Sequence, residues 1–231
     1  MALSLKVDFV SDVSCPWCVI GLYAFEQALD RVRDETTATI HFQPFELNPD
    51  MAPEGQDISE HIAEKYGSSP EQIAANREMI RARGAALGFT FNMQQRSRIY
   101  NTFDAHRLLH WAELEGRQYT LKRALFNAYF TAGQDPSAHP VLLKLATEAG
   151  LDRARAAQIL ASDEYTAQVR ARERFYQNQG IHSVPAIIIN DQYLLQGGQP
   201  VAAFEQALRQ IIAQVGANAA SSDAGTTAST Y

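Results

Sequence analysis

Two cysteines separated by two residues lie between a predicted strand and a predicted helix, and this feature constrains the chain most. Cys15 and Cys18 follow the short apolar run 7–10 and precede the helical pattern 22–32. The first turn of a helix has unpaired backbone N–H groups and carries the positive end of the helix dipole. A thiolate at Cys15 would be stabilised there, which predicts a reactive cysteine at neutral pH.

Pro16 and the spacing of the two cysteines agree with this placement. Pro16 suits the first helical turn, because its missing N–H would have no partner there. Cys18 lies one turn after Cys15, on the same face of the helix. Their two sulfurs can form a small disulfide ring or present two thiols to a partner. We predict that Cys15 is the exposed, reactive thiol and that Cys18 is buried.

Two alternatives to redox chemistry are zinc binding and inert packing. A structural zinc site needs four ligands, and the chain has no cysteine besides these two. His106 and His110 have helical spacing but no evident third ligand, so we expect a hydrogen-bonded pair on a helix and no metal. Buried cysteines that act as small hydrophobic residues are the other alternative. A CxxC pair between a strand and a helix favours redox chemistry over both.

Composition and charge restrict the class of protein and its partners. The chain has 231 residues, of which 46% are hydrophobic and 20% are charged, as in soluble globular proteins. The net charge of -6 argues against nucleic acid or an anionic membrane as a partner. Residues 1–6 lack the basic flank and long apolar core of a signal peptide, which predicts a cytoplasmic location. Thiols are normally reduced there, so a lone cysteine pair is expected to be catalytic.

The apolar pattern predicts an α/β domain that is split by a helical insertion. A strand at 7–10, the helix after the cysteines and a strand at 39–45 form a strand–helix–strand unit, which favours a parallel pair. Helical periodicity then continues for more than a hundred residues. Val184 and Pro185 open another buried strand, followed by a tight turn, a second strand and a last helix at 201–215.

This pattern gives a predicted domain organisation. The tail after the last helix is rich in Ala, Ser and Thr and has no apolar period, which predicts disorder. The predicted segments are the first half of the α/β domain at 1–50, the helical insertion at 51–178, the second half at 179–216 and the disordered tail at 217–231.

These elements together resemble the thioredoxin fold, and the inserted helices resemble the DsbA family of that fold. The resemblance covers about residues 5–215. It implies an α/β thioredoxin fold with an inserted all-helical domain. The segments similar to the FrnE-like branch of the family are DF at 8–9, CPWC at 15–18, FELNP at 45–49, NTFDAHR at 101–107 and SVP at 183–185.

The resemblance implies thiol–disulfide exchange at the two cysteines. Cys15 would be the nucleophile, and Cys18 would resolve the mixed disulfide by attacking Cys15. Pro185 would be a cis-proline that faces Cys15, and Val184 would offer its N–H and C=O to an extended substrate segment. An ordinary trans proline that opens an edge strand is the alternative.

Several neighbouring residues are candidates to bind substrate or to tune the thiols. Pro16 and Trp17 would form part of the substrate surface, with packing of Trp17 against the insertion as the alternative. The thioredoxin resemblance suggests that Asp8 is buried beneath Cys18, although its spacing from the cysteines departs from the usual one. A solvated or capping role is the alternative for Asp8 and the favoured one for Asp12. His182 lies either near the sulfurs or in a loop.

Two function classes follow from these features. The first is a dithiol oxidoreductase of reductase or isomerase type, acting on a disulfide-containing protein or a small thiol, with no cofactor besides the Cys15–Cys18 disulfide. The second is a glutathione-dependent isomerase or transferase of small aromatic molecules, similar to 2-hydroxychromene-2-carboxylate isomerases, which usually carry serine at the first position. Two cysteines favour the first class. Glutathione as a co-substrate and a homodimer are compatible with these features.

Overall fold

The centre of the protein is a four-stranded mixed sheet with the strand order β2-β1-β5-β6. The structure is a computed structural model that describes residues 3–226, with side chains described for 3–218. β1 pairs parallel with β2 and antiparallel with β5, which pairs antiparallel with β6. Strands from both ends of the chain therefore form one sheet. They are β1 (Leu3–Ser11), β2 (Thr36–Pro44), β5 (Ala186–Ile189) and β6 (Tyr193–Gln196).

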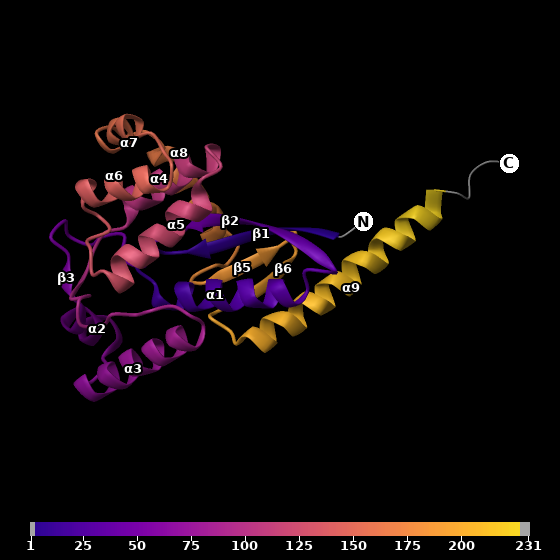
Figure 1. Cartoon of the computed structure of the whole chain (residues 1–231), viewed down its shortest axis with the longest axis horizontal. Helices are drawn as coiled ribbons and strands as arrows, with labels where there is room; N and C mark the ends of the chain where they lie inside the picture. Colours follow the sequence, from indigo (N-terminus) through magenta and orange to yellow (C-terminus); the bar gives the residue numbers. More distant parts are fainter. Residues whose placement is uncertain (1–2, 227–231) are drawn as a thin grey trace.

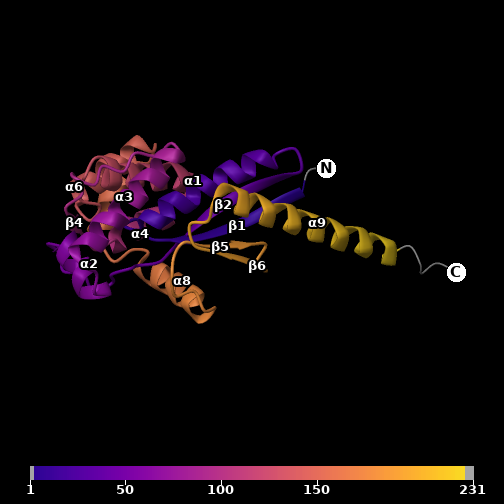
Figure 2. The same cartoon turned by 90° about the horizontal axis from the view of Figure 1, so that it is seen from below.

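Helices cover both faces of this sheet. Figures 1 and 2 show α1 (Pro16–Arg31) and α9 (Val201–Thr226) on one face and α8 (Thr166–Asn178) on the other. The second half of β1 is buried on both sides, and it accordingly reads as a nearly continuous apolar run. The rings of Phe25 and Phe204 meet edge to face at 5.5 Å and join α1 to α9. These layers form an α/β fold around the cysteine-bearing end of α1.

A large insertion lies between β2 and β5. It was predicted as all-helical, and this is wrong in one detail, because two short segments pair antiparallel as β3 and β4. Two residues on each side are too few to show strand alternation in a sequence. The elements of the insertion before α8 are β3 (Gln56–Asp57), α2 (Ile58–Tyr66), α3 (Pro70–Ala86), β4 (Arg98–Ile99), α4 (Phe103–Leu114), α5 (Gln118–Phe126), the π-helical turn η1 (Asn127–Thr131), α6 (His139–Glu148) and α7 (Arg153–Leu160).

The insertion has a hydrophobic core of its own and shares a second one with the sheet. Leu108, Leu121 and Leu142 belong to a cluster formed mainly by α4 to α7. Phe126 and Phe130 instead join the cluster that contains the sheet, α1 and both cysteines. The end of α5 is therefore the place where the insertion reaches the cysteines from inside the protein.

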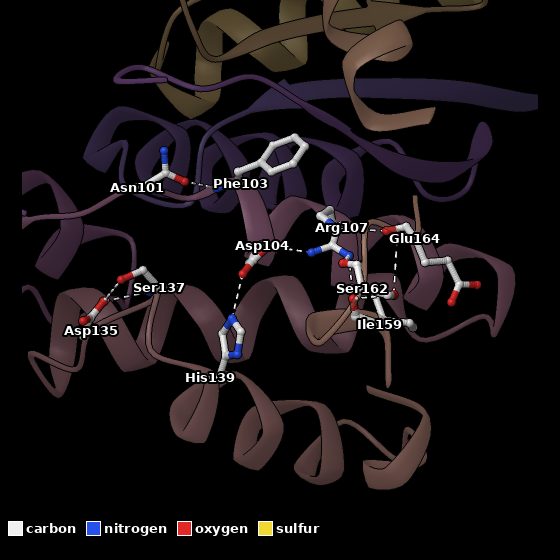
Figure 3. Close-up of polar contacts among 10 residues, drawn as sticks. All are labelled: Asn101, Phe103, Asp104, Arg107, Asp135, Ser137, His139, Ile159, Ser162 and Glu164. Carbon is white, nitrogen blue, oxygen red and sulfur yellow. Dashed lines mark hydrogen bonds and ion pairs between the residues drawn. The ribbon is translucent and has the colours of Figure 1, made fainter. Parts of the chain in front are cut away.

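Arg107 connects the helices of the insertion through a buried polar network (Figure 3). The residue is 4% exposed, and its guanidinium donates to the carbonyl oxygens of Ile159, Ser162 and Glu164. The same group donates to the carboxylate of Asp104 at 2.8 Å. These carbonyls lie at the end of α7 and in the turn after it, so Arg107 ties α4 to that segment.

The predicted disordered tail is wrong over most of its length. α9 continues to Thr226, and residues 227–231 lie outside the described part of the chain. Alanine is the best helix former, and a helix already begun at Val201 adds one hydrogen bond for each further residue. Figure 1 shows this helix extending past the end of the sheet. Between residues 3 and 226, the helices all fall short of the length and apolar character that crossing a membrane requires.

Candidate active site

Cys15 is the N-cap residue of α1, and Pro16 is the first residue of the helix. The backbone N–H of Cys18 donates to the carbonyl of Cys15 at 3.1 Å. Both cysteines are free thiols. They lie between β1 and α1, at the strand–helix junction predicted from the sequence. The prediction of an exposed Cys15 is wrong, because its side chain is only 3% exposed and Cys18 is fully buried. Cys15 packs into the core shared with the sheet and lies against the Val184 carbonyl, and spacing within the motif does not reveal these contacts.

Cys15 lies against the start of β5. Its Sγ atom is 3.7 Å from the carbonyl oxygen of Val184, to which the thiol donates. The peptide bond between Val184 and Pro185 is cis. Gly21 of α1 closely approaches the proline, since a Cβ atom at Gly21 would lie 2.8 Å from Pro185 Cγ. Two segments from opposite ends of the chain thus meet at the Cys15 sulfur.

Trp17 is half-buried and fits both interpretations of its role. The ring packs against the insertion, with the guanidinium carbon of Arg83 at 5.1 Å from its centroid. Trp17 and Pro16 also line the cleft that leads to Cys15. Trp17 also meets Gly198, where an added Cβ would lie 3.2 Å from the indole.

A cleft of about 780 Å³ opens over Cys15 between the cysteine end of α1 and helices α2 and α3. Apolar side chains such as Phe45, Ile80 and Met93 form much of its wall. His182 also lines it, three residues before Pro185. The cleft is large enough for a small molecule and places it against the Cys15 sulfur.

The charged groups in this cleft are mainly cationic, although the whole protein is acidic. Lys65, Arg77 and Arg96 line it, and none has a carboxylate within ion-pair distance among the described residues. Lys65 instead donates to the Leu47 carbonyl at 2.7 Å. Glu46 is the one carboxylate in the described lining, and burial raises the pKa of Glu46 to about 7. Positive charge therefore dominates the cleft near neutral pH, which favours an anionic ligand.

Asp12 organises the turn that leads into the cysteines. It is 1% exposed, and its carboxylate accepts from Ser14 Oγ at 3.0 Å and from the N–H of Leu47 at 2.7 Å. His106 Nε2 lies 3.6 Å from the same carboxylate, which is close enough for electrostatic attraction. Burial acts to raise the pKa of Asp12, but His106 and the Leu47 N–H outweigh it and hold the pKa at about 2. The backbone carbonyl of Asp12 accepts from the N–H of Cys15 at 3.3 Å, so Asp12 is a buried structural residue.

Asp8 does not lie beneath Cys18. Its carboxylate accepts from Gln43 Nε2 at 2.6 Å and lies 3.0 Å from Lys6 Nζ. Val7 and Phe9 belong to the core shared with α1, and side chains alternate along a strand. Asp8 consequently faces α8, on the opposite side of the sheet from the cysteines.

The charged residue behind the thiols is Lys122 of α5, which sequence reasoning missed. Burial raises the pKa of Cys18 well above its usual value, the adjacent Cys15 adds to this, and Lys122 opposes it. The sequence does carry a signal for this lysine. Lys122 precedes Phe126 by four residues and follows Leu121, so it occupies a position in an apolar stripe where a charge is unusual.

The predicted substrate residues come together around Cys15, and a metal site does not form there. Pro16 and Trp17 line the cleft, as does Val184, and Pro185 packs behind them on α1. Across the described part of the chain, no group of three or more His, Cys, Asp or Glu side chains is arranged to hold a metal ion. His110 packs against the ring of Tyr165, with the ring centroids 5.1 Å apart, whereas His106 lies beside Asp12.

Comparison with known proteins identifies the family. A model of the DSBA-like thioredoxin domain matches residues 6–209. The chain belongs to this family of disulfide oxidoreductases. The crystal structure of a probable DsbA oxidoreductase, SCO1869 from Streptomyces coelicolor, is 34% identical, superposes with a TM-score of 0.84 and covers 89% of each chain.

Two further relatives are more distant. The uncharacterized protein YwbO of Bacillus subtilis (strain 168) is 27% identical over 207 residues, which span 89% of this chain and 96% of YwbO. The cytosolic disulfide reductase DsbM from Pseudomonas aeruginosa, solved with GSH, is 18% identical with a TM-score of 0.59 and covers 88% of this chain and 99% of its own. The likeness to DsbM is one of fold.

Proposed function

We propose that the protein is a thiol–disulfide oxidoreductase of the reductase or isomerase type that uses Cys15 and Cys18. The observation that carries the proposal is the position of Cys15. Its sulfur lies at the base of a cleft, 3.7 Å from the Val184 carbonyl, with a second, fully buried thiol one helical turn away. A nucleophile at a helix start with a resolving thiol behind it is the arrangement that disulfide exchange requires.

The reaction proceeds in two exchanges. The Cys15 thiolate attacks one sulfur of a substrate disulfide, that S–S bond breaks, and one substrate thiol leaves. Cys18 then attacks Cys15 Sγ, which forms the Cys15–Cys18 disulfide and releases the second substrate thiol. Val184 offers backbone groups to the substrate beside the sulfur, and Pro16 and Trp17 contact it in the cleft. A thiol from the reduced cytoplasm returns the enzyme to its dithiol form.

Cysteine variants test this scheme directly. In an assay of insulin reduction driven by a dithiol, Cys15→Ser should abolish turnover. Cys18→Ser should instead accumulate mixed disulfides with substrate, since Cys15 still attacks but is not resolved. The scheme fails if Cys18→Ser neither traps substrate nor loses turnover. Alkylation at mildly acidic pH should modify Cys15 before Cys18, because Cys18 is fully buried and its pKa is raised.

The redox poise is the second part of the proposal. Pro16 and Trp17 provide no charged hydrogen-bond donor to the Cys15 sulfur, so the reduced form gains less stabilisation than in a strongly oxidising DsbA protein. We expect a potential suited to reduction or isomerisation. Equilibration with glutathione measures it, and His182→Ala tests whether the histidine in the cleft wall supplies the missing charge. A potential as oxidising as that of the periplasmic enzymes would contradict this assignment.

Glutathione-dependent conversion of a small aromatic acid is the second candidate, and the cationic cleft favours it. Lys65, Arg77 and Arg96 lack ion-paired carboxylates among the described residues and suit an anionic ligand such as glutathione. DsbM, which shares this fold, was solved with GSH. Glutathione-dependent turnover of a chromene carboxylate by Cys18→Ser would support the isomerase. Activity that requires both cysteines supports the oxidoreductase, with glutathione as its co-substrate.

A further inference from the structure

Lys122 of α5 is a buried cation without a hydrogen-bond partner. The side chain is 0% exposed, and Nζ has no donor or acceptor group of the described residues within hydrogen-bonding distance. It lies over two aromatic rings instead, 4.9 Å from the centroid of Phe126 and 5.6 Å from that of Phe42. Removing an ammonium group from water is unfavourable unless an opposite charge compensates it. A methionine of similar length would fill the same space without that cost.

The position of Lys122 is fixed by α5 and β2. Gln118, one turn earlier on α5, accepts from the Phe42 N–H at 2.8 Å and donates to the Phe42 carbonyl at 2.9 Å. This pair of bonds holds α5 against β2 and brings Lys122 over the Phe42 ring. The amine therefore points into the core that contains both cysteines.

The titratable groups that act on this amine are the two thiols and Asp12. Burial lowers the pKa of Lys122 to about 8, and Cys18, Asp12 and Cys15 oppose that shift, with Cys18 first. The Asp12 carboxylate already accepts hydrogen bonds from Ser14 and Leu47, and His106 lies close to it. In the mixed disulfide Cys15 is bonded to the substrate sulfur and carries no charge, so a thiolate at Cys18 is then the thiol anion that the lysine can stabilise.

We propose that Lys122 is the buried positive charge that stabilises the Cys18 thiolate when it resolves the mixed disulfide. This inference rests on the proposed exchange reaction. Cys18 gives up its proton and its sulfur attacks Cys15 Sγ. The bond between Cys15 and the substrate sulfur breaks, and that sulfur leaves with the bonding electron pair and takes the proton. Lys122 keeps its own proton throughout and acts as a positioning residue through its charge.

Single-turnover reaction with the aromatic disulfide DTNB tests this role, because each exchange releases one coloured thiolate. The first phase reports attack by Cys15, and the second reports resolution by Cys18. In Lys122→Met and Lys122→Gln the first phase should stay within about twofold of the natural chain. The second phase should slow at least threefold, since the thiolate fraction falls about tenfold for each unit of pKa increase and higher nucleophilicity offsets only part of it.

The melting temperature of Lys122→Met separates a role in resolution from a structural role. Methionine removes an uncompensated buried charge, so Lys122→Met should melt at or above the temperature of the natural chain while it resolves more slowly. Lys144→Met is the matched control, because Lys144 is exposed on α6 and pairs with Glu148 at 2.9 Å. The control should leave both phases unchanged.

The outcomes assign failure to one proposal or the other. Equal second-phase rates in Lys122→Met and the natural chain, equal slowing of both phases, or a lower melting temperature of Lys122→Met would each overturn the role of Lys122. A natural chain that releases only one thiolate per molecule would contradict the proposed exchange reaction itself.

Discussion

Two buried cations of the insertion, Arg107 and Lys122, have opposite surroundings. Arg107 is 4% exposed and donates to three backbone carbonyls and to Asp104. Lys122 is fully buried and donates to nothing among the described residues, while two aromatic rings flank it. A cation whose donors are all matched stabilises one arrangement of helices. A buried cation without a hydrogen-bond acceptor lowers stability. Beside two thiols, however, it can stabilise a negative charge that forms on sulfur during a reaction.

The largest effect is expected at the matched cation. Arg107→Met leaves the carbonyls of Ile159, Ser162 and Glu164 and the Asp104 carboxylate without their donor, so the free energy of unfolding should fall by about 3–5 kcal/mol. Denaturant titration measures this loss. The DTNB phases of the folded variant should match those of the natural chain. A loss below about 1 kcal/mol would remove the contrast between the two cations.

Replacing Lys122 should raise the free energy of unfolding, whereas replacing Arg107 lowers it, and the size of the gain should depend on pH. The pKa of Lys122 is about 8 when folded and 10.5 as an ordinary lysine, so the unfolded chain binds more protons between these values. Stability therefore rises with pH in this window, and the cost of the buried charge is complete below pH 8. At pH 7 Lys122→Met should be more stable by up to about 3 kcal/mol. This advantage should shrink towards pH 10 in parallel thermal melts, and a constant difference would contradict it.

The carboxylate of Asp12 is a buried anion with hydrogen-bond donors around it. Its contribution to the free energy of unfolding should disappear at acidic pH. Its pKa of about 2 lies below the usual 3.8, so its contribution is present above pH 4 and is lost as the pH falls through 2. We expect a contribution of about 2 kcal/mol. Asp12→Asn should lose stability at pH 5 and much less at pH 2, as measured by urea unfolding at both values. Equal losses at both pH values would show that charge is not involved.

The smallest effect is expected at the exposed edge of the Arg107 network. His139 Nε2 lies 2.8 Å from Asp104 Oδ2, but the His139 side chain is 49% exposed (Figure 3). Exposed pairs contribute little, so His139→Ala should cost less than about 1 kcal/mol. A loss comparable to that of Arg107→Met would mean that the network acts as one unit.

Local signals allowed the cysteine motif and the split fold to be predicted. The position of Cys15 and Cys18 follows from a strand, a proline and a helical pattern within a few residues. The split domain follows from a change of period along the chain. The family comparison agrees with that architecture, whereas the FrnE-like branch stays a prediction.

The missed features depend on contacts between distant segments. Lys122 meets Phe42 only because α5 packs on β2. The cleft over Cys15 is lined by α2 and α3, which the sequence predicts as helices without saying what they lie against. The alternation of β1 could have shown that Asp8 and Phe9 face opposite sides, and the family resemblance obscured this signal. The helical tail shows that an alanine-rich segment can be helical when it continues a helix that already precedes it.

The cleft over Cys15 has a consequence for selectivity. In the proposed reaction a substrate disulfide would reach this sulfur through the cleft of about 780 Å³. If the proposed exchange reaction takes place there, the dimensions of the entrance would act together with the redox potential to select which disulfides react. In that case small acidic disulfides would enter directly, whereas a folded protein would have to present a protruding loop.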